Sequence, residues 1–201
     1  LLEPLSSVMH GLDGVTVRPD DTVVLLGAGA ISLLHLLALR AMGITRILVI
    51  GRRPTRAHTA AQLGAMDVYT GDLADAPEYV RQHTAGRGAD LVIECTGQVP
   101  VWEAAMPLAR IGGQVIFFGG CAPGTQVRID TQRFHYDQLR LSSPFHFTPR
   151  AVRRSYELLT SDRFEGAGLI TDTYALTDLP TALDRHHRGD GIKFALLSED
   201  Q

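Results

Sequence analysis

Cysteine and lysine are both scarce in this chain of 201 residues. Two cysteines, Cys95 and Cys121, cannot form a disulfide framework or hold a structural zinc ion alone. They indicate a reducing compartment and predict a cytoplasmic protein, in which both act as core or loop thiols rather than nucleophiles. Lys193 is the single lysine among 19 basic residues, and the rest are arginine.

An excess of either charge is also missing. The 19 basic and 22 acidic side chains give a formal net charge of −3 and are mixed along the chain. Because there is no basic field and no polybasic tail, we expect no nucleic-acid partner and no membrane partner. Residues 1–5 have neither the basic start nor the long apolar core of a signal peptide. Without an initial Met, the chain is interpreted as a fragment or a processed form.

No hydrophobic run is long enough to cross a membrane. Residues 23–39 carry no formal charge, but the run stops at Arg40, short of the ~20 residues that a spanning helix needs. The run contains two glycines, with a short apolar segment before them and a leucine-rich segment of helical length after them. This order indicates a strand, a glycine turn and a buried helix. With 45% hydrophobic and 20% charged residues, the composition is that of a globular protein rather than a disordered one.

Short apolar segments alternate with segments of helical length. Continuous apolar strands separated by helices are typical of a parallel sheet covered on both faces, and right-handed crossovers then give a doubly wound sheet. The sequence therefore predicts one α/β unit over residues 20–145. Strands are predicted at 22–26, 46–50, 66–69, 89–94, 114–118 and 139–142, and helices at 31–42, 55–63, 77–84 and 102–110.

The two ends of the chain differ from this pattern. Residues 3–18 are predicted to form a helix and a turn that lead into the sheet. Residues 149–161 are predicted to form an amphipathic helix, whose inward face carries Val152, Tyr156, Leu158 and Leu159. Beyond it, the sequence predicts a strand at 169–174, a helix at 179–186 and a strand at 192–197.

The strongest local signal lies between the first predicted strand and the first predicted helix. There the sequence reads Gly27-Ala28-Gly29-Ala30-Ile31-Ser32. Gly27 allows a tight turn, Gly29 lets the backbone approach a pyrophosphate, and free N–H groups at the start of the helix attract that anion. Ser32 stands where Gly or Ala is usual, and we expect it to loosen helix–strand packing slightly. The turn predicts a dinucleotide site, and the alternative is a structural turn in a sheet that binds nothing.

The end of the second predicted strand discriminates between dinucleotides. An NAD site usually has an acidic residue about 20 residues after the glycines, where it binds the ribose hydroxyls. Here the position holds Gly51, followed by Arg52 and Arg53, and no acid follows before Asp67. A carboxylate would repel a 2′-phosphate, whereas a guanidinium binds one through two parallel hydrogen bonds. The sequence predicts NADP(H), with a solvated loop in an arginine-rich protein as the alternative.

An ordered set of motifs carries a family resemblance over residues 3–201. The set comprises Glu3-Pro4-Leu5-Ser6-Ser7 with His10-Gly11, Asp20-Asp21-Thr22-Val23-Val24, Ala61-Gln62-Leu63-Gly64-Ala65, Asp90-Leu91-Val92-Ile93-Glu94-Cys95-Thr96-Gly97, Gly112-Gly113-Gln114-Val115 and Gly189-Asp190-Gly191-Ile192-Lys193. Together they resemble the C-terminal portion of the medium-chain dehydrogenase/reductases, in the sorbitol and threonine dehydrogenase-like branch of the zinc-dependent alcohol and polyol dehydrogenases. The resemblance implies a Rossmann fold.

The resemblance implies a role for each matching position, and it places no catalytic acid, base or nucleophile in this chain. For Lys193 the alternative is a solvated surface lysine. The residues expected to contact the cofactor are Gly27, Gly29, Ala30, Ile31 and Ser32 at the pyrophosphate turn, Gly51, Arg52 and Arg53 at the 2′-phosphate, Thr96 and Gly97 on the adenosine side, Phe118 and Gly119 on the nicotinamide side, Phe145 beside the carboxamide, and Lys193 near the phosphates.

Glu3 resembles a ligand, or near-ligand, of the family's catalytic zinc. The other ligands, a Cys and a His-Glu pair, are expected in an upstream domain. Catalytic zinc needs about three protein ligands, so Glu3 alone is not expected to bind it tightly. The alternative is a carboxylate favoured by the dipole at a helix N-terminus. The implied division is an entry segment at 1–19, a nucleotide-binding domain at 20–147 and a segment at 148–201 that returns to the catalytic domain.

The function implied by the resemblance is that of an NADP(H)-binding portion of a zinc-dependent oxidoreductase. The whole enzyme would interconvert a secondary alcohol, polyol or sugar-like, and its ketone, while the isolated chain would bind cofactor with little or no turnover. Family members pair identical subunits through this domain, which implies a homo-oligomer with an interface near residues 114–143. Two alternatives stay open: a zinc-free quinone or enoyl reductase of the same superfamily, and a non-catalytic NADPH-binding module.

Overall fold

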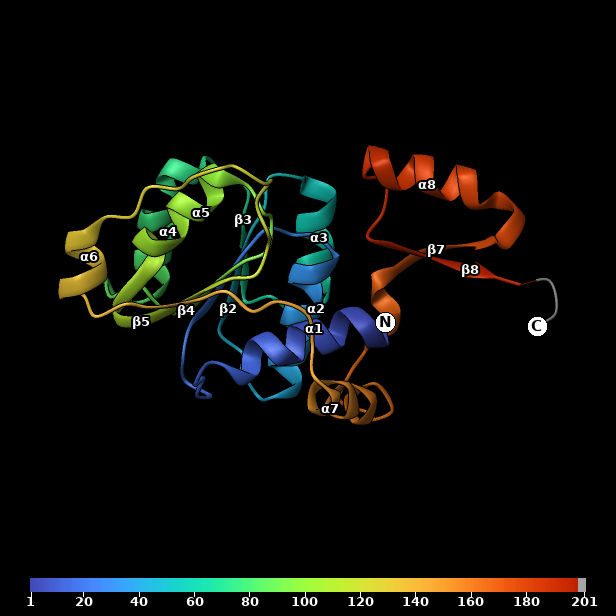
Figure 1. Cartoon of the computed structure of the whole chain (residues 1–201), viewed down its shortest axis with the longest axis horizontal. Helices are drawn as coiled ribbons and strands as arrows, with labels where there is room; N and C mark the ends of the chain where they lie inside the picture. Colours follow the sequence, from blue (N-terminus) through green and yellow to red (C-terminus); the bar gives the residue numbers. More distant parts are fainter. Residues whose placement is uncertain (199–201) are drawn as a thin grey trace. The chain divides into compact units, whose positions relative to one another are not determined.

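The computed structural model describes residues 1–198. The chain divides into two compact units, Leu1–Phe164 and a C-terminal unit that begins at Glu165 (Figure 1). Within the described part of the chain, no helix combines the length and the apolar character needed to cross a membrane.

The first unit is built on one six-stranded sheet, in which every neighbouring pair of strands is parallel. The predicted doubly wound α/β sheet is therefore confirmed. The strand order is β3-β2-β1-β4-β5-β6. The strands are β1 (Val23–Leu26), β2 (Ile47–Ile50), β3 (Asp67–Tyr69), β4 (Ala89–Glu94), β5 (Ala109–Phe117) and β6 (Arg140–Ser142).

Helices cover both faces of this sheet. The helices of the first unit are α1 (Leu2–Asp13), α2 (Ala30–Ala41), α3 (Pro54–Gln62), α4 (Ala76–His83), α5 (Val99–Ala105), α6 (Thr131–Tyr136) and α7 (Pro149–Leu159), with the 3-10 turns η1 (Leu73–Asp75) and η2 (Met106–Leu108). One core lies between alternate residues of β1, β2, β4 and β5 and the helices α4 and α5 with η2. The helices α1, α2 and α3 lie over the other face (Figure 1).

The three central strands β1, β2 and β4 are buried at every position. Their residues are Val23–Leu26, Ile47–Ile50 and Ala89–Glu94, which are almost wholly apolar. A strand covered by helices on both faces has no solvent side, so its sequence shows no polar alternation. That is why these strands were predicted within one residue of their observed bounds.

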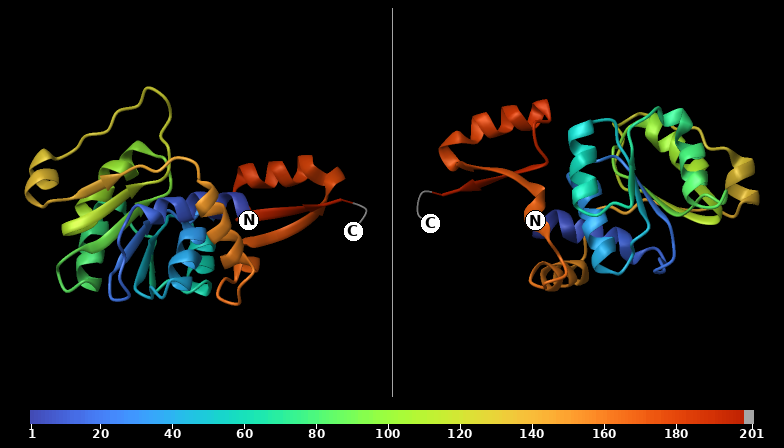
Figure 2. Two further views of the ribbon diagram at one scale, coloured as in Figure 1. Left: turned by 60° about the horizontal axis from the view of Figure 1, so that its bottom comes forward. Right: turned by 180° about the vertical axis from the view of Figure 1, so that it is seen from behind.

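One predicted helix ends early. The sequence predicted a helix at 102–110, but α5 ends at Ala105 and β5 already begins at Ala109. Pro107 has no N–H to continue the helix, and its ring interferes with the preceding turn. Ala109 then pairs with Ala89 of β4, and the chain bends at Gly112, where φ is +70°, before the main part of the strand. The long loop from β5 to α6 rises away from the sheet (Figure 2).

The amphipathic helix predicted at 149–161 forms α7, and its inward face differs in part from the prediction. Leu158 is buried as predicted, while Val152 and Leu159 are half-buried. Its buried residues are Ala151, Ser155 and Leu158, which follow one another at helical spacing. Tyr156 is 60% exposed, so its predicted inward placement is wrong. The stripe of small residues lets α7 pack closely on α1, which leaves the bulkier Tyr156 beside the contact.

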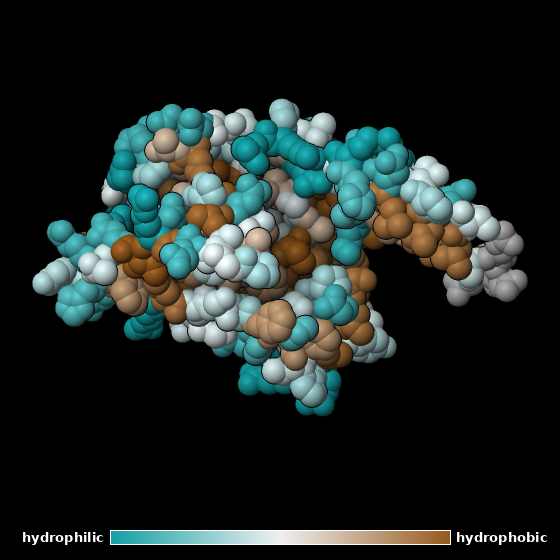
Figure 3. Space-filling model, turned by 45° about the horizontal axis from the view of Figure 1, so that its top comes forward, coloured by the Kyte–Doolittle hydropathy of each residue, from teal (hydrophilic) through white to brown (hydrophobic). Residues whose placement is uncertain are grey.

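The C-terminal unit contains a two-stranded parallel sheet and one α-helix, with two 3-10 turns. Its elements are η3 (Gly166–Leu169), β7 (Ile170–Ala175), η4 (Leu176–Asp178), α8 (Leu179–Arg188) and β8 (Lys193–Leu197). Arg185 binds both Asp172 and Tyr174, which ties α8 to β7. Hydrophobic residues gather on one side of this unit and hydrophilic residues on the other (Figure 3). Its exposed apolar side chains are Leu176, Leu179, Leu183, Leu196 and Leu197.

Truncation of the fully buried Leu25 in β1 tests this core. Leu25→Ala removes buried apolar surface and leaves a cavity, so the free energy of unfolding should fall by about 2–5 kcal/mol. Urea unfolding followed by fluorescence of Trp102, the single tryptophan, measures the change. Ile111→Ala is the matched control, because Ile111 is 67% exposed and its loss should change stability by less than about 0.5 kcal/mol. Equal losses in the two variants would contradict the assigned core.

Candidate functional site

The loops that follow four adjacent strands meet at one edge of the sheet. β1, β2, β4 and β5 are parallel, so Gly27, Gly51, Cys95 and Phe118 all begin loops at their carboxyl ends. The chain runs outward from β1 to β3 and then returns to β4 on the other side of β1. Ligands of such sheets bind outside the carboxyl ends at this switch point, so this edge is the candidate site.

The glycine turn after β1 has no room for a side chain. Gly27 has a φ of +107°, a conformation that side chains disfavour. A Cβ at this position would also lie 3.0 Å from Cγ2 of Thr96. The Gly27 N–H donates to the carbonyl oxygen of Ile50 at 2.8 Å, which fixes the turn against β2. Both the conformation and the close approach therefore require glycine.

The N-terminus of α2 lies at this edge without a capping side chain. Gly29 is the N-cap residue, and neither a side-chain cap nor an acidic residue occurs in the first turn. The first N–H groups of a helix have no partner within the helix. Ala30 and Ile31 therefore begin a helix whose positive end is suited to an anion such as a pyrophosphate.

Ser32 closes the glycine turn. Its side chain is buried, and its hydroxyl donates to the carbonyl oxygen of Gly27 at 2.6 Å. This bond, which Gly or Ala cannot make, ties the start of α2 to the turn, and the expected looser packing stays a prediction.

The loop after β2 passes directly against the glycine turn. A Cβ on Gly51 would lie 2.7 Å from the Cβ of Ala28, so only glycine fits without a shift of the main chain. Arg52 and Arg53 follow and are exposed, and Arg53 is the N-cap residue of α3. The predicted arginine run therefore starts where the two loops touch.

Arg56 is the residue of this site that the sequence prediction missed. Its Nη1 atom lies 3.8 Å from the position that a Cβ on Gly29 would take. Partial burial lowers the pKa of Arg56, and the nearby positive charge of Arg53 lowers it further. The available signal was spacing, since residues three apart in the first turn of a helix share a face. The guanidinium of Arg56 therefore lies beside the uncapped N-terminus of α2, where positive charge favours an anion.

The loops after β4 and β5 pack main chain against main chain. Gly97 has a φ of +66°, and a Cβ there would meet the carbonyl oxygen of Gly120. A Cβ on Gly119 would meet the backbone nitrogen of Gly97. The two predicted cofactor loops are therefore a single packed layer, with Thr96 reaching from it to Gly27.

Phe118 turns its ring into the packing beneath the site. The ring meets His35 edge-on, with centroids 4.7 Å apart, and a Cβ on Gly11 would lie 3.3 Å from it. His35 is fully buried, and this burial lowers its pKa to about 4. Its Nδ1 lies 3.0 Å from the Ile31 carbonyl oxygen and 3.8 Å from Cys95 Sγ. If Phe118 contacts a cofactor, we therefore expect its main chain rather than its ring to make the contact.

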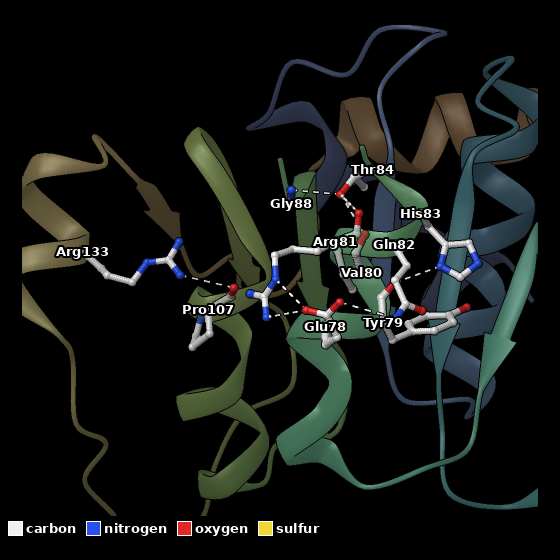
Figure 4. A network of polar contacts seen from close by, with 10 residues as sticks. All are labelled: Glu78, Tyr79, Val80, Arg81, Gln82, His83, Thr84, Gly88, Pro107 and Arg133. Atoms are coloured by element: carbon white, nitrogen blue, oxygen red, sulfur yellow. Dashed lines mark hydrogen bonds and ion pairs between the residues drawn. The ribbon is translucent and has the colours of Figure 1, made fainter. Parts of the chain in front are cut away.

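A cavity of about 330 Å³ lies at the opposite edge of the sheet, near the start of β4 and β5. Arg81 and Arg133 line it, but both guanidinium groups already have partners. Arg81 pairs with Glu78 of its own helix at 3.0 Å, and Arg133 donates to the carbonyl oxygen of Pro107 (Figure 4). Arg133 also donates to the carbonyl oxygen of Ala109, which ties α6 to β5. Because both guanidinium groups already have partners, the cavity is less suited to a ligand than the carboxyl edge.

Comparison with known proteins agrees with the geometry. The protein-family model described as zinc-binding dehydrogenase matches residues 30–161, more than half of the chain. The chain belongs to the zinc-binding dehydrogenase family.

Curated relatives match most or all of the chain. The alignment with the probable D-xylulose reductase A of Arthroderma otae shows 29% identity over 204 residues, and covers 100% of this chain and 57% of that protein. The D-altritol 5-dehydrogenase of Agrobacterium fabrum is 29% identical over 183 residues, and the alignment covers 89% of this chain and 52% of that protein. This chain spans little more than half the length of these relatives.

A solved structure shows the same fold. A protein assigned as a zinc-binding dehydrogenase from Sinorhizobium meliloti 1021, bound to NADP, superposes with a TM-score of 0.82 and 27% identity. The match covers 90% of this chain and 54% of that protein.

The zinc after which the family is named has a single predicted ligand here. Glu3 is exposed in the first turn of α1, where its carboxylate accepts a hydrogen bond from Ser7 at 3.5 Å. Among residues 1–198, no group of three or more His, Cys, Asp and Glu side chains is arranged to hold a metal ion. These residues do not make a zinc site by themselves, and the role of Glu3 stays a prediction.

Two other predicted residues belong to later elements of the chain. Phe145 is 81% exposed in the loop after β6, where its ring stacks against His146 with centroids 3.9 Å apart. Lys193 is the first residue of β8 and belongs to the C-terminal unit. Their assignments to the cofactor stay predictions.

Replacement of His35 by leucine should remove an acid-sensitive contribution to stability. The pKa of about 4 in the folded protein lies below the usual 6.5, so the unfolded chain binds the proton more readily. The free energy of unfolding is then undiminished above pH 6.5 and falls by up to about 3 kcal/mol as the pH drops toward 4. Urea unfolding across this range should show that loss in the wild type and not in His35→Leu.

The exposed His58 of α3 provides the control. His58→Leu should keep the pH dependence of the wild type. If His35→Leu also kept it, the acid sensitivity would belong to other groups and the buried, neutral state of His35 would be wrong.

Proposed function

We propose that this chain is the NADP(H)-binding part of a zinc-dependent oxidoreductase that interconverts a secondary alcohol, polyol or sugar-like, and its ketone. The observation that carries the proposal is the guanidinium of Arg56 beside the uncapped start of α2. Membership of the zinc-binding dehydrogenase family supports it.

The preference for NADP(H) over NAD(H) rests on charge. An acidic residue at the end of β2 would bind ribose hydroxyls, but Gly51 occupies that position. Arg52, Arg53 and Arg56 instead supply guanidinium groups that can bind a 2′-phosphate through paired hydrogen bonds. The relative from Sinorhizobium meliloti, bound to NADP, supports the same choice.

The residues of this chain have binding and orienting roles. The first N–H groups of α2 bind the pyrophosphate, the arginines bind the 2′-phosphate, and the packed loops around Thr96 and Gly119 hold the adenosine and nicotinamide ends. A bound nicotinamide supplies hydride transfer. Because no described residue of this edge is placed as an acid or base for that step, catalytic groups and the remaining zinc ligands are proposed to lie in another part of the whole protein.

The substrate class is taken from the relatives. Their names are D-xylulose reductase, D-altritol 5-dehydrogenase and sorbitol dehydrogenase, all of which refer to polyols or sugars. We therefore place the substrate among small polyhydroxylated secondary alcohols and their ketones.

We propose the domain division that the family resemblance implies. Residues 1–19 would enter from a catalytic domain, 20–147 would bind the nucleotide, and 148–201 would return. The exposed apolar side of the C-terminal unit supports the proposal that the chain returns to the catalytic domain (Figure 3). An apolar patch of this kind usually packs against another part of a protein.

We expect identical subunits to pair through residues 114–143. β6 is an edge strand, and Phe134 and Tyr136 are exposed in the helix beside it, so this region offers both unpaired main-chain groups and apolar surface. Light scattering should give the mass of a dimer or a larger assembly. A monomer at high micromolar concentration would contradict the pairing.

Cofactor choice is tested by calorimetric titration of this chain with NADPH and with NADH. The wild type should bind NADPH more tightly. Arg53→Ala and Arg56→Ala should each weaken NADPH binding by roughly 10- to 100-fold and leave NADH binding nearly unchanged, because each removes a charge-assisted bond to the 2′-phosphate.

Arg87→Ala is the matched control, since Arg87 is an exposed arginine in the loop before β4, at the opposite edge of the sheet. It should bind both cofactors as the wild type does. Equal binding of NADPH and NADH by the wild type would overturn the cofactor choice, and binding of neither would overturn the proposed site.

A further inference from the structure

A buried carboxylate lies between the two loops that are proposed to hold the cofactor. Glu94 is the last residue of β4, and its side chain is fully buried. Burial of a carboxylate is unfavourable unless hydrogen bonds replace the water that it loses. The partners of Glu94 therefore indicate why a charge is placed at this point.

The side chain of Glu94 binds the loop that follows its own strand. One carboxylate oxygen accepts from the backbone N–H of Thr96 at 2.6 Å and from the Thr96 hydroxyl at 2.5 Å. The other oxygen accepts from the N–H of Gly97 at 3.2 Å. All three donors belong to residues proposed to contact the adenosine end of the cofactor.

The main chain of Glu94 binds the neighbouring loop. Its carbonyl oxygen accepts from the N–H groups of Phe118 and Gly119, both at 2.9 Å. The carboxylate also lies close to this loop, since a Cβ on Gly119 would be 2.9 Å from Oε2 of Glu94. Trp102 of α5 completes the contact by donating to the Gly119 carbonyl oxygen at 2.8 Å.

Thr96 connects Glu94 to the glycine turn. Its hydroxyl is held by Glu94, so its methyl group Cγ2 faces Gly27, 3.0 Å from where a Cβ would be. A change in the Glu94 contacts would therefore move the surface on which the pyrophosphate turn rests.

We propose that Glu94 is a positioning residue for the dinucleotide, which holds the Thr96–Gly97 and Phe118–Gly119 loops in the form that receives it. The inference rests on the proposed function. Glu94 does not contact the cofactor itself, because its side chain is enclosed by these loops.

The electrostatics fit this role. Burial raises the pKa of Glu94, while the hydrogen bonds from Thr96 and Gly97 oppose that rise. The pKa stays raised overall, so the burial of this group is only partly offset by its bonds. The geometry of the three bonds, which fix the loop after β4, is what carries the positioning role.

Asp90 provides a matched comparison on the same strand. It is also buried, but near the amino end of β4, where it accepts from the Thr22 N–H at 2.7 Å and pairs with Arg110 at 2.5 Å. Both carboxylates stabilise local contacts of β4. Only Glu94 lies at the edge with the proposed cofactor loops.

The test compares Glu94→Gln with Asp90→Asn in the whole chain described here. In Glu94→Gln the amide nitrogen must face at least one of the three donors, so a bond to the loop is lost. NADPH affinity, per folded molecule, should fall about tenfold. Asp90→Asn should lower the thermal midpoint and leave NADPH affinity unchanged.

Trp102 supplies a readout that does not require cofactor. Because it is the single tryptophan and bonds to Gly119, its emission should shift to longer wavelength in Glu94→Gln and not in Asp90→Asn. Amide hydrogen exchange at Thr96 and Gly97 should accelerate in the same variant. If Glu94→Gln does not fold, Thr96→Val removes one of the three bonds with little change in shape and should show the same changes in smaller degree.

The outcomes separate this inference from the proposed function. Suppose that the wild type binds NADPH and that Glu94→Gln shows the same NADPH affinity and the same Trp102 emission. This result would overturn the positioning role alone. Equal losses of affinity in Glu94→Gln and Asp90→Asn would also overturn it, because they would reflect general destabilisation. A wild type that binds no dinucleotide would overturn the proposed function, and with it the role of Glu94.

Discussion

The close approach of main chains at the carboxyl edge of the sheet is the constraint on which the site depends. The turn after β1 contacts the loop after β2 at Gly51 and the loop after β4 at Thr96. The loops after β4 and β5 meet at Gly97 and Gly119 in the same manner. A side chain at any of these glycines would separate two loops. The edge is therefore one packed layer, and a ligand that binds to it meets backbone groups held by their neighbours.

Charge is distributed over this layer in two separate places. The Arg56 side chain lies beside the start of α2, where the helix dipole adds to its attraction for an anion. The carboxylate of Glu94 lies beneath the surface, where its two oxygens accept hydrogen bonds from Thr96 and Gly97. The surface that faces a ligand is thus positive, while the carboxylate serves the protein itself. This separation lets a buried acid order the loops without repelling a phosphate.

Membership of the zinc-binding dehydrogenase family gives this edge its context. The chain matches little more than half the length of its relatives, and its described residues contain no cluster suited to a metal ion. Cofactor binding and metal chemistry are then proposed to lie in different parts of the protein. The C-terminal unit, with one apolar side exposed, has a form suited to packing against such a part.

The parallel sheet and its glycine turn were predictable from the sequence, because strands buried on both faces are continuous apolar runs and a φ of +107° at Gly27 requires glycine. The end of α5 was predicted wrongly, since apolar periodicity continued past Pro107 while the pairing of Ala109 with Ala89 decided the strand. Arg56 and Glu94 were not recognised as parts of the site. Arg56 matters through its distance from Gly29, and Glu94 through donors on two loops, one of them more than twenty residues away. The sequence alone determined where the buried strands and the glycine turn lie, because local patterns of burial and backbone conformation decide those. Only the tertiary structure decided which side chains act together, because contacts across loops depend on how the strands are ordered in the sheet.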